Sequence, residues 1–323
     1  MLTRICAIAK DEAPYVADWI FHHLYFGFDQ IHVYINRTSD STALIIDRIL
    51  DIYPSISYEY IDWVDNCPID VTKKMQVIAY AKDLEWSKSN GVDWWFCLDI
   101  DETWVPKDFD ISIKDYLSGK CRENPICFMW HNAFGEIKPF SGVSPDSSYF
   151  VGKQVKTISP IQNVEVKRVR VHRHKFEENC ICHDADGEPF EFSETNIQVA
   201  SDQFIGTRNA YIIHQMFRSE PEYLNTLVRG NPEHEFALKN NRPGYKDDLT
   251  GKQPKYAWPT ENYRNYCMAR KQFYYTTGIE ALVNKSRDEI LAKSDVVKAK
   301  IQMMIDSGDK NIASIVDGTS LAF

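Results

Sequence analysis

One short segment limits the fold of this chain more than any other: an apolar run that ends abruptly in carboxylates. Residues 92–97 are mostly large and apolar, and the acidic Asp99, Asp101 and Glu102 follow almost at once. The run is too short for a membrane span and too aromatic for a loop, so it predicts a buried central strand. Acidic side chains at the carboxyl end of such a strand lie where open α/β sheets bind ligands.

The spacing of the two aspartates predicts a metal site. In extended backbone, side chains two positions apart face the same way, so Asp99 and Asp101 can share one hard cation. Ligation by oxygen favours Mg²⁺ or Mn²⁺ over zinc, and these ions commonly bridge a carboxylate to a diphosphate. The alternative interpretation is that both carboxylates only cap the turn that follows the strand.

Composition and charge exclude several classes of protein. The 323 residues are 44% hydrophobic and 26% charged, which indicates a globular chain with enough length for one large core or two domains. The formal net charge of -9 argues against nucleic acid as a partner, because nonspecific binding to phosphates needs a net basic surface. Scattered cysteines, and the lack of a long apolar leader or membrane-span segment, lead us to expect a cytoplasmic protein.

The amino-terminal residues predict a parallel crossover. Residues 5–9 indicate a strand, residues 15–24 a helix that Gly27 ends, and residues 31–35 a second strand. A strand, a helix and a strand joined by short turns form a right-handed parallel unit. Further along, we expect a helix over 43–50, a weaker strand over 56–61 and a helix over 73–89 that leads to the acidic segment.

Short motifs follow one another in a recognisable order over about residues 1–230. They are Lys10-Asp11-Glu12-Ala13 with Asp18-Trp19-Ile20, Asn36 with Ser39-Asp40, Leu98-Asp99-Ile100-Asp101-Glu102, Trp130 with Phe134-Gly135, Lys156-Thr157-Ile158, and His214-Gln215-Met216-Phe217-Arg218-Ser219 with Arg229-Gly230. In this order they resemble the motifs of the nucleotide-sugar glycosyltransferases of the GT-A fold, in the family 2-like and family 92-like group. The chain departs at Gln215, where a tyrosine is common, and at Glu136, where a small residue is usual.

The resemblance implies an α/β fold of the GT-A type, which is a Rossmann-like, mixed and mainly parallel sheet flanked by helices. We assign this domain to residues 1–230. From residue 231 on, loop-like segments precede helical patterns around 262–275 and 287–306. These patterns predict a mainly helical C-terminal extension over residues 231–323.

The resemblance also implies roles for single residues. Asp99, Asp101 and the late His214 would hold Mn²⁺ or Mg²⁺ against the phosphates of a nucleotide sugar, and a UDP-sugar is the expected donor. For His214 the alternative is a core histidine bonded to backbone, and for Asp11 it is helix capping. The residues expected to contact the nucleotide sugar are Asp11, Glu12, Asn36, Lys74, Asp99 and Arg218.

The expected reaction is glycosyl transfer to a glycan or glycolipid hydroxyl with inversion, which needs a carboxylate to take the hydroxyl proton. Asp202, Glu136 and Glu220 are candidates for this base, and the sequence does not choose among them. We expect an acceptor such as a lipopolysaccharide or capsule precursor. If the acceptor is linked to a lipid, we expect the protein to associate peripherally with the inner face of a membrane.

A basic run over residues 164–175 stands out in this acidic chain. Strand alternation would place Arg168, Arg170, His172 and His174 on one face, where a polyanion or a diphosphate could bind. A solvated edge strand that protects against aggregation is the alternative.

Two other functions stay open at this point. A sugar nucleotidyltransferase also combines an α/β sheet with a carboxylate-bound metal, but it would need a glycine-rich basic loop near the amino terminus, and residues 10–14 contain no glycine. An inactive GT-A fold that only binds carbohydrate is the second alternative. The presence of Asp99, Asp101 and His214 weighs against it.

Overall fold

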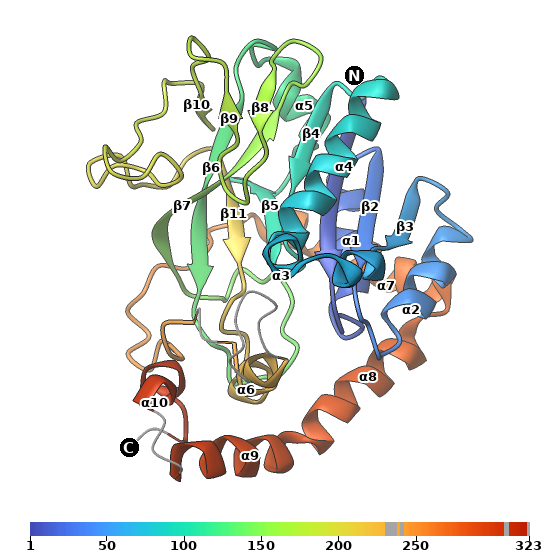
Figure 1. Cartoon of the computed structure of the whole chain (residues 1–323), viewed down its shortest axis with the longest axis vertical. Coiled ribbons are helices and arrows are strands. Elements are labelled where there is room, and N and C mark those ends of the chain that lie inside the picture. The colour runs from blue at the N-terminus through green and yellow to red at the C-terminus, as the bar shows by residue number, and fades with distance from the viewer. Residues whose placement is uncertain (230–237, 240–241, 307–309, 322–323) are drawn as a thin grey trace.

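The computed structural model describes residues 1–229, 238–239, 242–306 and 310–321, and one mixed sheet forms its centre (Figure 1). The strands of this sheet are β1 (Thr3–Ala9), β2 (Gln30–Ile35), β3 (Ile56–Tyr60), β4 (Trp94–Cys97), β5 (Glu102–Pro106), β6 (Ile126–Ala133), β7 (Tyr149–Ser159), β10 (His183–Asp184) and β11 (Ala210–His214). Their order is β3-β2-β1-β4-β7-β6-β11-β5, with β10 beside β6.

Most strands of the sheet run in one direction. β1 pairs in parallel with β2 and β4, β2 with β3, and β11 with β6. β7 is antiparallel to β4 and β6, and β5 is antiparallel to β11. The carboxyl ends of β1, β2, β4, β6 and β11 therefore meet at one edge. The expected mixed, mainly parallel α/β sheet is confirmed, and so is the buried acidic-ended strand, although it begins at Trp94.

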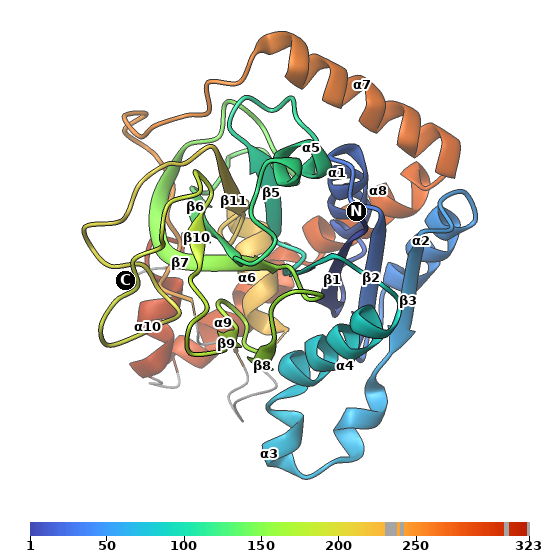
Figure 2. The ribbon, with the colours of Figure 1, turned by 90° about the horizontal axis from the view of Figure 1, so that it is seen from above.

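Alternation within the strands divides the core into two layers. Ile5 and Trp94 face the layer that contains α1 (Val16–Tyr25) and α2 (Thr42–Leu50), whereas Cys6 and Trp95 face α4 (Met75–Ser89). Figure 2 shows α1 and α4 on opposite sides of β1 and β2. Strands covered on both faces are apolar at every position, which explains why the sequence shows continuous apolar runs. The expected helix over 73–89 begins at Met75, after the separate α3 (Ile69–Thr72).

The C-terminal region is helical, as predicted. It consists of α7 (Thr260–Thr277), α8 (Glu280–Ala292), α9 (Ser294–Asp306) and α10 (Lys310–Val316), and the helix expected over 287–306 is divided between α8 and α9. α7 packs on α1, and the line of helices then curves beneath the sheet to reach α6 (Glu220–Val228) (Figure 1). The expected domain boundary at residue 230 lies outside the described residues. Within the described residues, no helix combines the length and hydropathy needed to cross a bilayer.

The basic run over residues 164–175 does not form the single strand that alternation predicted. The chain reverses between β8 (Val166–Arg168) and β9 (Lys175–Phe176), which pair antiparallel. His174 is buried and stacks on Trp95 at 4.9 Å between ring centroids, whereas Arg168 is exposed. The prediction of one shared basic face is therefore wrong, because the run folds back so that its apolar residues and His174 join the core beneath β4.

Asp18 joins the C-terminal helices to the first helix of the sheet domain. Its carboxylate accepts hydrogen bonds from Arg270 Nε at 2.6 Å, Tyr274 OH at 2.7 Å and Arg287 Nη2 at 2.8 Å. Burial alone would raise the pKa of Asp18, but the two guanidinium groups outweigh burial and lower it. Asp18 is therefore the ionised link between α1, α7 and α8.

We expect Asp18→Asn to lower the free energy of unfolding at pH 7 by about 2 kcal/mol, since the amide is uncharged and its NH2 group cannot accept the hydrogen bonds that the replaced oxygen accepted from an arginine. Because the pKa of Asp18 is lower in the folded state, the contribution of Asp18 to stability is complete above the unfolded-state pKa of about 4. It is lost as the pH falls through the folded-state pKa. Urea unfolding at pH 7 and pH 3 measures both. The exposed Asp110→Asn is the control, and equal losses in the two variants would contradict the assigned link.

Candidate active site

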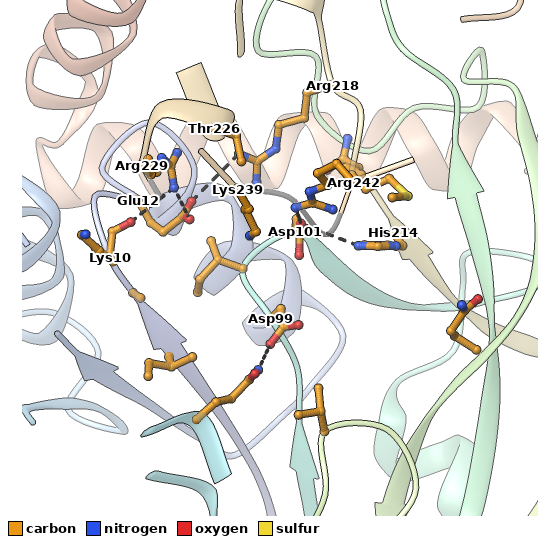
Figure 3. Close-up of a pocket in the computed structure, with 18 of the residues that line it drawn as sticks. Lys10, Glu12, Asp99, Asp101, His214, Arg218, Thr226, Arg229, Lys239 and Arg242 are labelled. Atoms are coloured by element: carbon orange, nitrogen blue, oxygen red, sulfur yellow. Dashed lines mark hydrogen bonds and ion pairs between the residues drawn. The ribbon is translucent and has the colours of Figure 1, made fainter. Parts of the chain in front are cut away.

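A cavity of about 790 Å³ opens at the carboxyl ends of the parallel strands. Ala9 ends β1, Asn36 follows β2, Asp99 and Asp101 follow β4, and His214 ends β11, and all five residues line the cavity. Figure 3 shows Asp99, Asp101 and His214 among the labelled side chains. This is the edge at which open α/β sheets bind ligands, because the chain leaves the sheet there in loops that can carry polar groups.

The two aspartates lie in a tight turn between β4 and β5. The Glu102 amide donates to the Asp99 carbonyl at 3.0 Å, and Ile100 is buried below the turn. The extended backbone expected for this segment is therefore wrong. Both aspartates line the same cavity, but the turn gives them different neighbours.

The oxygens of the Asp99 carboxylate are engaged by the protein. Oδ1 accepts from Gln76 Nε2 at 2.6 Å and from Tyr80 OH at 2.9 Å, and Oδ2 lies 3.4 Å from Lys156 Nζ. Gln76 and Tyr80 are one turn apart on α4, so this helix positions Asp99 directly.

Asp101 points toward His214 and a basic side chain from the C-terminal region. Asp101 Oδ2 lies 3.6 Å from His214 Nε2 and 3.2 Å from Arg242 Nη2. Burial alone would raise the pKa of Asp101, but the guanidinium groups of Arg242 and Arg218, together with His214 whenever it is protonated, outweigh burial and lower it. Asp101 is therefore ionised in the cavity.

His214 is oriented by a partner on the neighbouring strand. Its Nδ1 lies 3.0 Å from Asn132 Oδ1, and the two residues are paired in the parallel register of β11 and β6. An amide oxygen only accepts, so we assign the ring proton to Nδ1, which leaves the lone pair of Nε2 toward Asp101. Burial lowers the pKa of His214 and favours this neutral form. Gly152 makes room, because a Cβ there would lie 2.4 Å from Asn132 Nδ2.

Asp101 and His214 are the side chains that best fit a divalent ion. No group of three or more His, Cys, Asp or Glu residues suited to a metal occurs among the described residues. An ion held by these two residues would take its other ligands from substrate oxygens and water, as Mg²⁺ and Mn²⁺ commonly do beside phosphates. The proton on His214 Nδ1 is consistent with this use, since a metal-binding histidine usually donates its other N–H to a fixed acceptor.

Arginines with buried guanidinium nitrogens face the other half of the cavity. Arg229 Nη1 donates to Glu12 Oε1 at 2.6 Å and to the Lys10 carbonyl at 3.2 Å. The Nε and Nη2 atoms of Arg229 and the Nε atom of Arg242 are buried without a hydrogen-bond partner among the described residues. Burial also lowers the pKa of the nearby Lys239 to about 8. Unpartnered charged donors are costly in isolation, so this region is suited to an anion.

Arg218 closes the cavity on the side of α6. Its guanidinium carbon lies 3.4 Å from the centroid of the Tyr15 ring, and its Nη1 lies 3.9 Å from Glu12 Oε2. The backbone of Arg218 has a φ of 53°, a left-handed conformation that is strained for a residue with a side chain. Such strain often occurs where a loop must place one side chain at a site.

A buried ion pair supports the acidic turn from below. Lys156 Nζ lies 2.9 Å from Glu102 Oε2, and both side chains are fully buried. Glu102 Oε2 also accepts from the Asp99 amide at 2.9 Å. Burial raises the pKa of Glu102, although Lys156 opposes this shift, and the neighbouring carboxylates raise the pKa of Lys156 despite its burial. This network fixes the turn that presents Asp99 and Asp101.

The predicted nucleotide-sugar residues divide into two groups. Glu12, Asn36, Asp99 and Arg218 line the cavity, but Asp11 and Lys74 do not. Asp11 Oδ1 accepts from the Ser39 amide at 2.7 Å and so ties the loop after β1 to the loop after β2. Lys74 is the residue before α4, and its neighbour Lys73 lines the cavity instead.

The three candidate bases lie in different places. Glu136 lines a second cavity beside the first, and its Oε1 accepts from Ser147 Oγ at 2.5 Å. Glu220 begins α6 and accepts from the Ser320 amide at 3.2 Å. Asp202 is 78% exposed and pairs with Lys153. Neither Glu220 nor Asp202 lines either large cavity.

Four residues that shape the site have no role predicted from the sequence. Lys239 and Arg242 come from a stretch that was interpreted only as the start of the C-terminal extension, and Asn132 and Lys156 lie inside strands. The signals were weak: a basic residue before Pro243-Gly244, and polar residues within otherwise apolar strands. Asn132 and Lys156 become informative only when the strand order is known, and Lys239 and Arg242 only when the path of the chain after α6 is known.

Residues 5–184, more than half of the chain, match the model of glycosyltransferase family 92. The chain belongs to glycosyltransferase family 92. It is therefore a glycosyltransferase, and the predicted family resemblance is confirmed. No match was found among curated proteins. Among solved structures, HddC from Yersinia pseudotuberculosis is 8% identical with a TM-score of 0.26, over 83% of this chain and 99% of that chain, a likeness too low to support an argument.

Proposed function

We propose that this family 92 enzyme transfers a sugar from a nucleoside diphosphate donor, and that the diphosphate binds in the 790 Å³ cavity. One observation carries the proposal. Buried nitrogens of Arg229 and Arg242 lack partners among the described residues, and they belong to a cavity that also holds the ionised Asp101 and neutral His214. Diphosphate oxygens would satisfy these donors and would be near enough to the acidic turn to share a cation with it.

The charge of the cavity supports an anionic ligand. The chain as a whole carries a formal charge of -9, yet cationic side chains outnumber carboxylates in the cavity, six against three. Excess positive charge in a concave site attracts anions, because low-dielectric walls concentrate its field. The cations are Lys10, Lys73, Arg218, Arg229, Lys239 and Arg242, and the carboxylates are Glu12, Asp99 and Asp101.

In this proposal Asp101 and His214 would hold Mn²⁺ or Mg²⁺, and the bound ion would supply Lewis-acid stabilisation of the charge that develops on the departing diphosphate. Arg229 and Arg242 donate hydrogen bonds to the same group. Asn132 holds His214 in the tautomer that leaves Nε2 free. A UDP-sugar is the proposed donor, with its nucleoside beside Asn36 at the ends of β1 and β2.

We propose that Glu136 is the base that takes the proton of the acceptor hydroxyl. Of the three candidate bases, Glu136 is the one that lines a cavity adjoining the donor site. The acceptor oxygen forms a bond to the anomeric carbon while the bond from that carbon to the diphosphate oxygen breaks. The electron pair of the broken bond stays on the nucleoside diphosphate, and the hydroxyl proton moves to the Glu136 carboxylate. The proposed acceptor is a hydroxyl of a glycan or glycolipid.

We expect UDP to bind at least about tenfold more weakly in EDTA than in Mn²⁺, because the phosphates would otherwise meet the carboxylates of Asp99 and Asp101 without a bridging cation. Isothermal titration calorimetry in the two conditions measures this difference. Uridine is the control, since without phosphates its affinity should not depend on metal. Equal UDP affinity in both conditions would argue for a transferase that relies on its arginines alone.

A further inference from the structure

A second cavity of about 880 Å³ lies beside the proposed donor site. Ile100, Gln215 and Arg218 line both cavities, so a single layer of side chains separates them. The remaining walls come from α1, from residues 136–144 after β6, and from the C-terminal helices α7 and α8. The C-terminal extension therefore completes a cavity that the sheet domain leaves open.

The charge of the second cavity differs from that of the first. Its walls carry five carboxylates and five cationic side chains, whereas cations exceed carboxylates in the donor cavity. Several of these charges already neutralise one another, because Asp18 binds both Arg270 and Arg287. A balanced set of charges gives no net attraction for an anion, so this cavity is suited to an uncharged ligand.

The lining of the second cavity suits a sugar. The aromatic side chains of Tyr15, Phe140, Tyr263 and Tyr266 contribute to its walls together with the amide of Asn284. Aromatic rings provide apolar faces for the C–H side of a sugar ring, while amides and carboxylates exchange hydrogen bonds with hydroxyls.

Two buried polar atoms at this cavity lack a partner among the described residues. They are the hydroxyl of Tyr15 and the Oε1 atom of Glu222, and their residues are only 9% and 1% exposed. The other oxygen of Glu222 is engaged by Ser219 Oγ at 2.6 Å and by the Phe140 amide at 2.9 Å. A ligand that carries hydroxyl groups can both donate to the carboxylate and bond to the phenol, which would remove the cost of leaving them unpaired.

We propose that the second cavity binds the acceptor, and that this acceptor presents an uncharged glycan to the enzyme. A hydroxyl of that glycan would reach the donor past Gln215 and Arg218, the residues that line both cavities. Helices α7 and α8 thereby determine which acceptors are used. The inference rests on the proposed function, because it assumes that the first cavity holds the nucleotide sugar.

Helix α8 offers a matched pair of variants to test the acceptor site. Asn284 and Lys285 are adjacent and exposed, and only Asn284 lines the second cavity. Asn284→Trp would place a large ring in the cavity, whereas Lys285→Trp would add the same ring outside it. Neither side chain is part of the donor cavity, so both variants should fold and should bind UDP with Mn²⁺ as the wild type does.

The measurement is binding of labelled protein, with UDP and Mn²⁺ present, to an array of uncharged and anionic oligosaccharides. We expect the wild type and Lys285→Trp to bind uncharged glycans, and Asn284→Trp to bind them at least about tenfold more weakly. Unchanged binding by Asn284→Trp, binding of anionic glycans only, or no glycan binding by the wild type would overturn the inference. Calorimetry of UDP with the same three proteins tests the donor site separately, and absence of UDP binding there would instead refute the proposed function.

Discussion

Replacement of Asp101 by asparagine should reduce glycosyl transfer on the order of a thousandfold, which corresponds to several kcal/mol of lost transition-state stabilisation. The carboxylate is held ionised by Arg242, and in the proposed mechanism it would hold the cation that stabilises the departing diphosphate. An amide of the same shape has no charge, so it is a poor ligand for Mn²⁺ or Mg²⁺. The larger part of the loss should appear in kcat, because the cation acts most strongly on the charge that develops as the bond breaks.

The fold should survive this substitution. Asp101 lines an open cavity, and an asparagine can still accept a hydrogen bond from Arg242. We expect the free energy of unfolding to change by no more than about 1–2 kcal/mol. Circular dichroism and steady-state kinetics on the same samples separate the two effects, with the exposed Asp108→Asn as the control. A kcat close to the wild-type value, or a variant that is unfolded at the assay temperature, would refute the proposed role of Asp101.

The sheet was predictable because its strands are buried on both faces. Residues 5–9, 31–35 and 210–214 are apolar almost throughout, and turn-forming residues limit them, so local composition identifies each strand. The carboxyl end of each parallel strand then marks the position of the site without knowledge of the strand order. This is why Asp99 and Asp101 could be placed at the site from the residues alone, whereas His214 was expected beside them because of the family resemblance.

The contacts within the site depended on information that no local pattern contains. Asn132 orients His214 only because β6 and β11 are neighbours in parallel register, although 82 residues separate the pair in sequence. Arg242 reaches Asp101 across 141 residues. The turn at Asp99 and Asp101 is set by the buried pair beneath it, Glu102 and Lys156, so it overrides the extended backbone that residue spacing favours. Long-range packing thus decided which of the predicted polar residues are free to bind a ligand.

Gln215 shows how a departure from the family pattern can matter. A tyrosine is common at this position in the family pattern. Here the backbone amide of Gln215 donates to the Asp101 carbonyl at 2.8 Å, and the side-chain amide of Gln215 donates to the Ser141 carbonyl at 3.3 Å. The residue lines both cavities, so it connects the acidic turn to the wall of the proposed acceptor site. The backbone bond is independent of the side chain, which explains how the substitution can leave the acidic turn in place.

Removal of the buried amine in Lys156→Met should lower the free energy of unfolding at pH 7 by about 3–5 kcal/mol, because Glu102 would be left in the core without its cation. Lys156 is fully buried, and its Nζ lies 2.9 Å from Glu102 Oε2 and 3.4 Å from Asp99 Oδ2. Methionine fills a similar volume, so the loss would reflect charge and hydrogen bonding rather than a cavity. Urea unfolding provides the measurement.

The effect of pH on this variant follows from the pKa of Glu102, which burial raises while the Lys156 ammonium opposes the shift and favours the ionised carboxylate. Without Lys156 the folded-state pKa rises further, so the folded protein holds Glu102 protonated. When the pKa of a group is higher in the folded state than in the unfolded state, its contribution to stability is complete below the unfolded-state pKa, which is about 4.3 for Glu. That contribution is lost as the pH rises toward the folded-state pKa. Lys156→Met should therefore be more stable at pH 5 than at pH 8.

Two further variants isolate the ion pair. Lys153 lies on the same strand but is 52% exposed and pairs with the exposed Asp202, so Lys153→Met should change stability by less than about 1 kcal/mol. Adding Glu102→Gln to Lys156→Met removes the unpaired carboxylate, and the double variant should recover part of the lost stability. Two outcomes would show that Lys156 and Glu102 do not act together beneath the acidic turn. One is an equal loss of stability in Lys153→Met and Lys156→Met, and the other is a double variant whose loss of stability equals the sum of the losses of its two single variants.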